Sequence, residues 1–175
     1  MTTESTTKEH PILFSAEMVK AVLAGTKTMT RRVCKGAREL SCALDWPVES
    51  CPYGQVGGRL WVRETWDSAH DNVTGTAIFY KADFNDTVPK GDFTWRPPIF
   101  MPRWASRITL EITNISVERL QDITAGDCVK EGSYMATDKD DEGGFINLWD
   151  SINGKTYPWE SNPWCWVIEF KKVQL

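Results

Sequence analysis

The sequence predicts an α+β fold in which a mixed β-barrel is decorated by short helices. Three features predict it: extended segments with alternating apolar residues recur, a strong strand pattern closes the chain, and the helical segments are few and short. Helices and strands do not alternate as βαβ units require, so a doubly wound parallel sheet is not expected.

Composition indicates a single globular domain over residues 11–175, preceded by a flexible polar tail over 1–10. Hydrophobic residues make up 41% of the 175 residues, which is enough to bury a core without disulfides. The five cysteines follow no secretory signal, and no apolar run reaches the roughly 20 residues of a membrane span. We therefore expect reduced thiols, a cytoplasmic location and no contact with a membrane.

The first regular element expected is a helix between Ser15 and Gly25. Ser15 suits the N-cap, and Gly25 suits the residue that ends the helix. Val22 and Leu23 are two members of the expected apolar face. The helical period stops at Gly25, and the threonine-rich residues 27–33 predict an extended segment.

Most of the remaining chain predicts strands and turns. A long loop is expected over 36–58. Extended segments are expected over 57–69, 75–83, 104–120 and 163–174. Short helices are expected over 121–132 and 143–154, each of which ends at a glycine.

Basic residues gather in two stretches although the net charge is −4. Residues 20–38 contain six lysines or arginines and no acidic residue, and residues 93–110 contain Arg96, Arg103 and Arg107 and no acidic residue. If the two stretches meet in space, they form a positive cleft on an acidic body. The alternative is that they lie on separate solvated faces.

Lys27 and Thr30 are candidate catalytic residues. A threonine hydroxyl is a weak nucleophile unless a base takes its proton, and a desolvated lysine among cations can do so. Arg31 and Arg32 would lower the lysine pKa and could hold a phosphate. On an ideal strand, residues three apart point to opposite faces, so the pair needs a turn after Gly25. An ordinary basic strand is the alternative.

Glu131 and Glu64 are two further candidates. Glu131 follows a short helix and precedes a glycine, where the helix dipole does not favour a carboxylate. The alternative for Glu131 is a solvated side chain. Glu64 lies among apolar and aromatic residues, so if it is buried it must pair with a cation or stay protonated. A structural pair with an arginine is the alternative to a ligand-binding role.

Aromatic and basic residues interleave between Phe93 and Arg107. Trp95 and Trp104 are candidates for stacking on bases, and Arg103 and Arg107 are candidates for contacting phosphates. Tryptophans are also common in protein cores, and that alternative applies most to those near the C-terminal end of the chain.

No metal or cofactor is expected. The cysteines lack the CxxC spacing of a zinc site, and the chain has two histidines, His10 and His70. No P-loop, dinucleotide-binding glycine motif or HExxH helix is present. Neither histidine lies beside a nucleophile-elbow serine.

The residues "GTKTMTRR" at 25–32 resemble the glycine-x-lysine-x-x-threonine-x-arginine signature of the ASCH family, a branch of the PUA-like β-barrel folds. Similarity extends over most of the chain, through "CPYGQVGGRLWVRETW", "MPRWASRITLEI", "RLQDITAGDCVKEG" and "WESNPWCWVIEFK". The chain is most similar to the longer ASCH proteins of bacteria and their phages.

The resemblance implies a ligand that is RNA, a single-stranded nucleic acid or a modified nucleoside. Some small members of the family are amidohydrolases that remove the acetyl group from N4-acetylcytidine. The resemblance assigns the roles of base, nucleophile and proton carrier to Lys27, Thr30 and Glu131. This chain is longer than those enzymes, with extra residues between Arg32 and Gly57 and around Asp138.

Three function classes therefore remain open. One is an amidohydrolase that acts on an N4-acylcytidine-like nucleoside. A second is a non-catalytic reader of RNA or of a modified base, or a ribonuclease. A third is a protein-interaction module that uses exposed tryptophans. Turnover that requires Lys27, or salt-sensitive binding that requires Arg31 or Arg103, would distinguish them.

Overall fold

A computed structural model describes residues 8–35, 47–71, 75–84, 93–133 and 141–173. The strands are β1 (Glu9–Leu13), β2 (Met29–Val33), β3 (Arg59–Arg63), β4 (Trp66–Asp71), β5 (Gly75–Tyr80), β6 (Thr109–Arg119) and β7 (Trp164–Lys172). The α-helices are α1 (Ala16–Leu23), α2 (Ala125–Lys130) and α3 (Asp141–Asn153). Short 3₁₀ turns are η3 (Val48–Ser50), η4 (Lys81–Asp83), η5 (Pro98–Phe100), η6 (Arg103–Ala105), η7 (Leu120–Asp122) and η8 (Trp159–Ser161).

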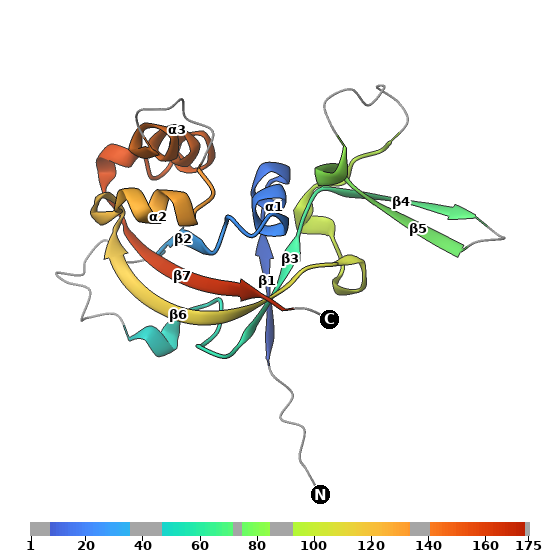
Figure 1. Cartoon of the computed structure of the whole chain (residues 1–175), viewed down its shortest axis with the longest axis horizontal. Helices are drawn as coiled ribbons and strands as arrows, with labels where there is room; N and C mark the ends of the chain where they lie inside the picture. Colours follow the sequence, from blue (N-terminus) through green and yellow to red (C-terminus); the bar gives the residue numbers. More distant parts are fainter. Residues whose placement is uncertain (1–7, 36–46, 72–74, 85–92, 134–140, 174–175) are drawn as a thin grey trace, which may run out of the picture.

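Five strands form one mixed sheet in the order β1-β3-β6-β7-β2, and β4 and β5 form a separate hairpin. β1 is parallel to β3, and the other ladders of the large sheet are antiparallel. Figure 1 shows β6 and β7 curving together, with α2 and α3 at one end of the molecule and the hairpin at the other. Mixed strands with short helices confirm the predicted α+β class.

The edges of the large sheet are β1 and β2. In the described residues no ladder joins these two strands, but the Arg32 Nη2 atom on β2 donates to Leu13 O on β1 at 2.7 Å. A β-bulge between Ile112 and Asn114 interrupts the register of β6 with β7. Bulges bend strands, which accounts for part of the curvature of this pair.

Helix α1 begins and ends where the sequence predicts. The Ser15 hydroxyl accepts a hydrogen bond from Met18 N, and Gly25 ends the helix with φ +78°. The buried face consists of Val19 and Val22. Leu23 was expected on that face but is 39% exposed. At about 3.6 residues per turn the centre of the buried face lies between Val19 and Val22, and Leu23 lies at its edge.

Two predicted boundaries are wrong. The tail was expected to reach residue 10, yet Glu9 and His10 belong to β1 and pair with Arg59 and Leu60 of β3. The strand expected over 57–69 is two strands, because pairing changes at Glu64. Arg63 still pairs within the large sheet, where its carbonyl accepts a hydrogen bond from Phe14 N. Trp66 pairs instead with Tyr80 of the hairpin.

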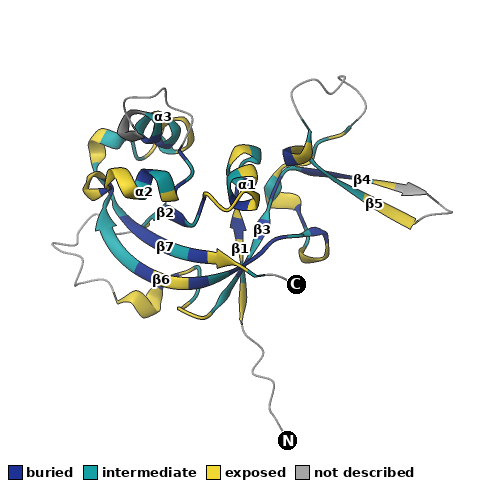
Figure 2. Ribbon diagram, in the orientation of Figure 1, coloured by how far each residue is buried: buried dark blue, intermediate teal, exposed yellow. Residues whose placement is uncertain are grey.

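The buried apolar residues of the described segments form three clusters. The largest lies between α1 and the large sheet and includes Phe14, Leu60 and Trp166. A second joins α2 and α3 to the start of β7, and a third anchors η5 and η6 against β4. Figure 2 shows that buried residues follow the strands of the large sheet, whereas the hairpin has intermediate and exposed residues along much of its length.

Candidate functional site

The end of α2 is fixed against the segment that connects α1 to β2. A capping box of Thr124 and Asp127 starts α2, and Glu131 is its C-cap. The carbonyl of Lys130 accepts a hydrogen bond from Thr28 N at 2.8 Å. This backbone contact brings Lys27 beside Glu131, although 104 positions separate them in the chain.

Lys27 is 2% exposed and lies in the segment between the turn that ends α1 and the first residue of β2. Its Nζ donates at 2.8 Å to each of three acceptors, Glu131 Oε2, Glu131 O and Met29 O. Three acceptors match the three N–H groups of an ammonium. Burial lowers the Lys27 pKa most, Glu131 opposes that shift, and Arg32 and Arg31 add to it.

Arg31 is 4% exposed and lies among three carboxylates. Its Nη2 atom is 3.2 Å from Glu118 Oε2 and 3.2 Å from Asp127 Oδ2, and its Nη1 atom is 3.6 Å from Glu131 Oε1. Arg31 Nε and Glu131 Oε1 are buried atoms with no hydrogen bond to the described residues. Buried polar groups rarely lack partners, so these two atoms are candidates for ligand or water contacts.

Thr30 lies on β2 opposite Ile168 and is 2% exposed. It lines a cavity of about 20 Å³ together with Arg31, Arg32 and Glu131. Side chains of α3, among them Phe145 and Trp149, form the other wall. This volume has room for about one water molecule. In the part of the chain that the structure describes, no hydrogen bond occupies the Thr30 hydroxyl.

Arg32 also lines this cavity. Its guanidinium lies 5.6 Å from the centre of the Phe14 ring, and it donates to Leu13 O. Burial lowers the Arg32 pKa, with opposing effects of Tyr53 and Glu131. Lys27 contacts Glu131, which lines the cavity with Thr30, Arg31 and Arg32, and we call these five residues the Lys27 centre.

Glu64 and Arg107 form a second buried ion pair, which we call the Glu64 centre. Arg107 donates from Nε to Glu64 Oε1 at 3.0 Å and from Nη2 to Glu64 Oε2 at 3.1 Å. Its Nη1 atom contacts Asp83 at 2.7 Å, and its guanidinium lies 3.9 Å from the Tyr80 ring centre. Burial raises the pKa of the Glu64 carboxyl, and the Arg107 hydrogen bonds counteract that shift.

The remaining candidates are Trp95, which precedes η5, and Arg103 and Trp104 of η6. Trp95 stacks on Phe93, with ring centres 4.8 Å apart. Arg103 forms an ion pair with Glu9 at 2.7 Å. Trp104 is 64% exposed and packs edge-on against Trp66. None of the contacts described for these residues connects them with the Lys27 centre.

Three participants were not anticipated: Glu118, Asp127 and the α3 wall. Asp127 carries a partial signal, because it occupies the N3 position of a capping box. Glu118 lies on the long strand β6, and nothing in its neighbours indicates an arginine 87 positions away. Because an arginine offers five donors, it can join several distant carboxylates at once.

Two negative findings concern the described residues alone. Among them no group of three or more histidine, cysteine, aspartate or glutamate side chains is arranged to hold a metal ion. None of their helices combines the length and apolar character needed to cross a membrane.

Comparison with known proteins gives two structural matches. No family model matches the chain, and no curated protein matches it in sequence. The ASCH domain of Lactobacillus crispatus JV V101 is similar with a TM-score of 0.51 and 12% identity, over 97% of this chain and 82% of that chain. The chain has the fold of an ASCH domain. A DUF984 protein of Enterococcus faecalis V583 gives a TM-score of 0.46 and 9% identity, over 93% of this chain and 80% of that chain.

Proposed function

We propose that the chain binds a modified nucleoside at the Lys27 centre and hydrolyses an amide bond on its base, as in an N4-acylated cytidine. The observation that carries the proposal is the contact of Lys27 with Glu131, because Glu131 also lines the cavity that Thr30 lines. The ASCH fold supports a nucleic-acid or nucleoside ligand. The same fold does not select the substrate, so the assignment of an amide rests on the side chains.

The proposed reaction uses one proton shared by Lys27 and Glu131. Transfer of the ammonium proton to Glu131 leaves a neutral amine, which burial favours because it removes two charges from the interior. The amine then takes the proton of the Thr30 hydroxyl as the oxygen attacks the acyl carbon. The C–N bond breaks, protonated Glu131 supplies a proton to the leaving nitrogen, and water hydrolyses the acyl-threonine.

Arg31 has a positioning role in this proposal. Its Nη1 atom lies 3.6 Å from the Glu131 oxygen that Lys27 does not contact. It also holds Asp127, which starts the helix that carries Glu131. Because the cavity holds only about one water molecule, a nucleoside enters only if the side chains of α3 move away from Thr30.

The test is hydrolysis of N4-acetylcytidine by the wild type, Glu131→Gln and Thr30→Val. Glu131→Gln keeps the shape and removes the proton carrier, so we expect turnover to fall roughly 10²- to 10⁴-fold. Thr30→Val removes the hydroxyl at similar volume and should abolish turnover. Thermal unfolding of each variant shows whether the fold is retained.

Glu64→Gln is the matched control, because Glu64 is also a buried carboxylate paired with a cation. It lies in the Glu64 centre, and its turnover should match that of the wild type. Equal loss of turnover in Glu64→Gln and Glu131→Gln, or turnover by folded Thr30→Val, would contradict the proposed site.

A non-catalytic RNA or modified-base reader is the second candidate, favoured by exposed aromatic side chains. Phe100 is 69% exposed and Trp104 is 64% exposed, and the buried residues Met101 and Ala105 anchor the turns that carry them. Such rings stack on unpaired bases. The same rings suit a protein partner. Salt-sensitive binding of an oligonucleotide that Trp104→Ala weakens, without turnover of any acylated cytidine, would support the reader.

A further inference from the structure

A second cavity, of about 350 Å³, lies between β1 and the loop over residues 48–58. Its walls are Lys8, His10, Glu49, Cys51, Gly54, Gln55 and Gly58. None of these residues belongs to the Lys27 centre or to the Glu64 centre. The volume falls within the range of small-molecule sites in proteins.

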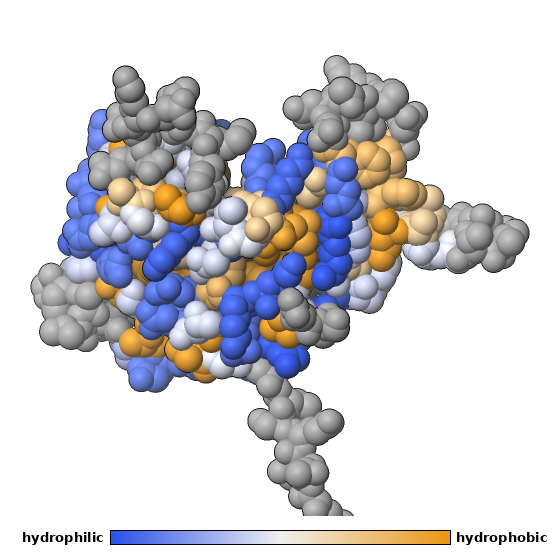
Figure 3. All heavy atoms as spheres, viewed as in Figure 1, coloured by the Kyte–Doolittle hydropathy of each residue, from blue (hydrophilic) through white to orange (hydrophobic). Residues whose placement is uncertain are grey.

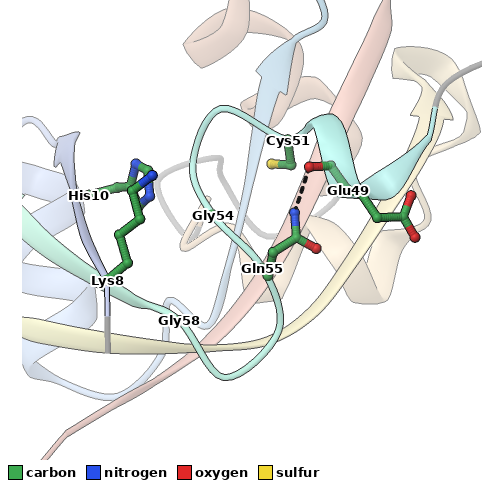
Figure 4. Close-up of a pocket in the computed structure, with 7 residues that line it drawn as sticks. All are labelled: Lys8, His10, Glu49, Cys51, Gly54, Gln55 and Gly58. Carbon is green, nitrogen blue, oxygen red and sulfur yellow. Dashed lines mark hydrogen bonds between the residues drawn. The ribbon is translucent and has the colours of Figure 1, made fainter. Parts of the chain in front are cut away.

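Strand geometry directs two basic side chains into this cavity. Successive side chains of extended chain point to opposite faces, so Lys8, which directly precedes β1, lies on the same side as His10, and Glu9 points to the other side. Glu9 is bound by Arg103 on that other side. Figure 4 shows the Lys8 and His10 side chains next to each other at one side of the cavity.

These two basic side chains have no partner in the described part of the chain. No ion pair or hydrogen bond of the described residues uses the Lys8 ammonium or the His10 imidazole. His10 is half-buried and lines the cavity. Figure 4 shows the Glu49 carboxylate pointing away from them, so the two groups are not neutralised by that acid.

The opposite wall is held in shape by backbone and side-chain hydrogen bonds. Gln55 Nε2 donates to Glu49 O at 2.9 Å, and Gly57 N donates to Ile112 O at 2.8 Å. Gly54 has φ +113°, and a Cβ atom there would lie 3.3 Å from His10 Cδ2. A side chain at residue 54 would therefore be strained and would press on the imidazole.

We propose that this cavity binds a small phosphomonoester, with the phosphate on Lys8 and His10. A compact dianion matches an ammonium and an imidazole N–H that converge from one strand, and charge-assisted hydrogen bonds of this kind are strong. The remaining volume accommodates a polar organic body beside Gln55. The site lies outside the proposed amide hydrolysis and does not depend on it.

Histidine NMR provides a direct test, because the chain contains two histidines, His10 and His70. The probes are inorganic phosphate, cytidine 5′-monophosphate, cytidine and succinate, each titrated at constant ionic strength. We expect the His10 imidazole signals to shift and saturate with the two phosphates while the His70 signals stay unchanged. Equal shifts at both histidines, the absence of saturation, or saturation with succinate but not phosphate would overturn the proposal.

Two variants and a control locate the effect. Lys8→Gln should weaken phosphate binding about 10- to 100-fold, because the free energy of one hydrogen bond to a charged group corresponds to roughly that change in Kd. Lys171→Gln removes the same charge from a 62% exposed side chain of β7 and should leave affinity unchanged. Gly54→Ala, if thermal unfolding shows it folded, should also weaken binding. Equal weakening by Lys8→Gln and Lys171→Gln would indicate nonspecific attraction and contradict the site.

Discussion

The Lys27 centre and the Glu64 centre both bury a carboxylate with cations, but they differ in what remains unpaired. Glu64 uses both oxygens in parallel bonds with Arg107. Glu131 uses Oε2 with Lys27, and its Oε1 atom has no hydrogen bond in the described residues. The cavity of about 20 Å³ borders Glu131, whereas neither cavity described above borders Glu64.

This difference separates a structural ion pair from a candidate for chemistry. A buried pair whose lone pairs and N–H groups are all satisfied resists change, because any shift exposes a charge to an apolar interior. A carboxylate with a free lone pair beside a cavity can accept a ligand proton without losing its first partner. Burial of charge alone therefore does not identify a site, and incomplete bonding next to open volume is the more specific sign.

The largest expected effect is on stability at the Glu64 centre. Arg107→Met keeps much of the side-chain volume but leaves Glu64, which is 1% exposed, without its cation. We expect the free energy of unfolding to fall by about 3–5 kcal/mol, as when one partner of a buried pair is removed. Urea unfolding measures the loss.

The double variant Arg107→Met with Glu64→Leu tests the cause of that loss. Replacing both partners by apolar groups removes the uncompensated charge, so it should restore most of the stability. If the double variant is no more stable than Arg107→Met, packing against Tyr80 is the main contribution of Arg107, and the Glu64 centre is not held by charge.

Local elements of the fold could be predicted from the sequence because their signals are local. Ser15 and Gly25 bound α1, and the apolar run from Trp164 onward forms β7. The break between β3 and β4 had no signal, because no glycine or proline interrupts the alternating pattern around Glu64. Only pairing with a distant strand and with the hairpin decides where β3 ends.

The candidate site could be predicted only in part for the same physical reason. Lys27 and Thr30 share a local motif, and the need of a buried Glu64 for a cation follows from desolvation. The sequence did not predict which arginine pairs with Glu64, since Arg107 lies 43 positions from Glu64 in the chain. Contacts of this kind depend on tertiary packing, and so does the closeness of α3 to Thr30.

An intermediate effect is expected at the glycine that follows Glu131. Gly132 has φ +77°, and a Cβ atom there would lie 2.9 Å from Ala21 Cβ and 3.2 Å from Lys27 Cβ. Gly132→Ala should cost about 1–3 kcal/mol for overpacking, in addition to roughly 1 kcal/mol for the left-handed backbone. Urea unfolding measures the total loss of stability. The substitution should also displace Lys27 from Glu131.

Gly25→Ala is the matched control for this prediction. Gly25 ends α1 at nearly the same φ, +78°, but a Cβ atom there would have no neighbour within 4 Å. It should cost only the roughly 1 kcal/mol of backbone strain. Equal destabilisation by the two substitutions would mean that the tight packing of α2 against Lys27 has no energetic consequence.

The smallest expected effect is a difference in pH dependence between the two centres. Burial acts to lower the Arg107 pKa, but the hydrogen bonds that Arg107 donates to Glu64 and Asp83 raise it overall, so Arg107 stays charged at every pH used for unfolding. The Lys27 pKa is lowered by burial below its ordinary value of 10.5. At pH values between the lowered pKa of Lys27 in the folded chain and its ordinary pKa in the unfolded chain, the unfolded chain binds more protons than the folded chain. The Lys27 contribution to the free energy of unfolding therefore rises with pH in this range.

The measurement is the free energy of unfolding between pH 7 and 10.5 for the wild type and for Lys27→Met. Subtracting the two curves removes the titration of cysteines and tyrosines, which both proteins share. The difference should favour the wild type increasingly as pH rises, with a slope of at most about 1.4 kcal/mol per pH unit for one proton. A flat difference would mean that Lys27 holds its proton as firmly as Arg107 does, and Lys27 would then be a structural cation that cannot serve as the base for Thr30.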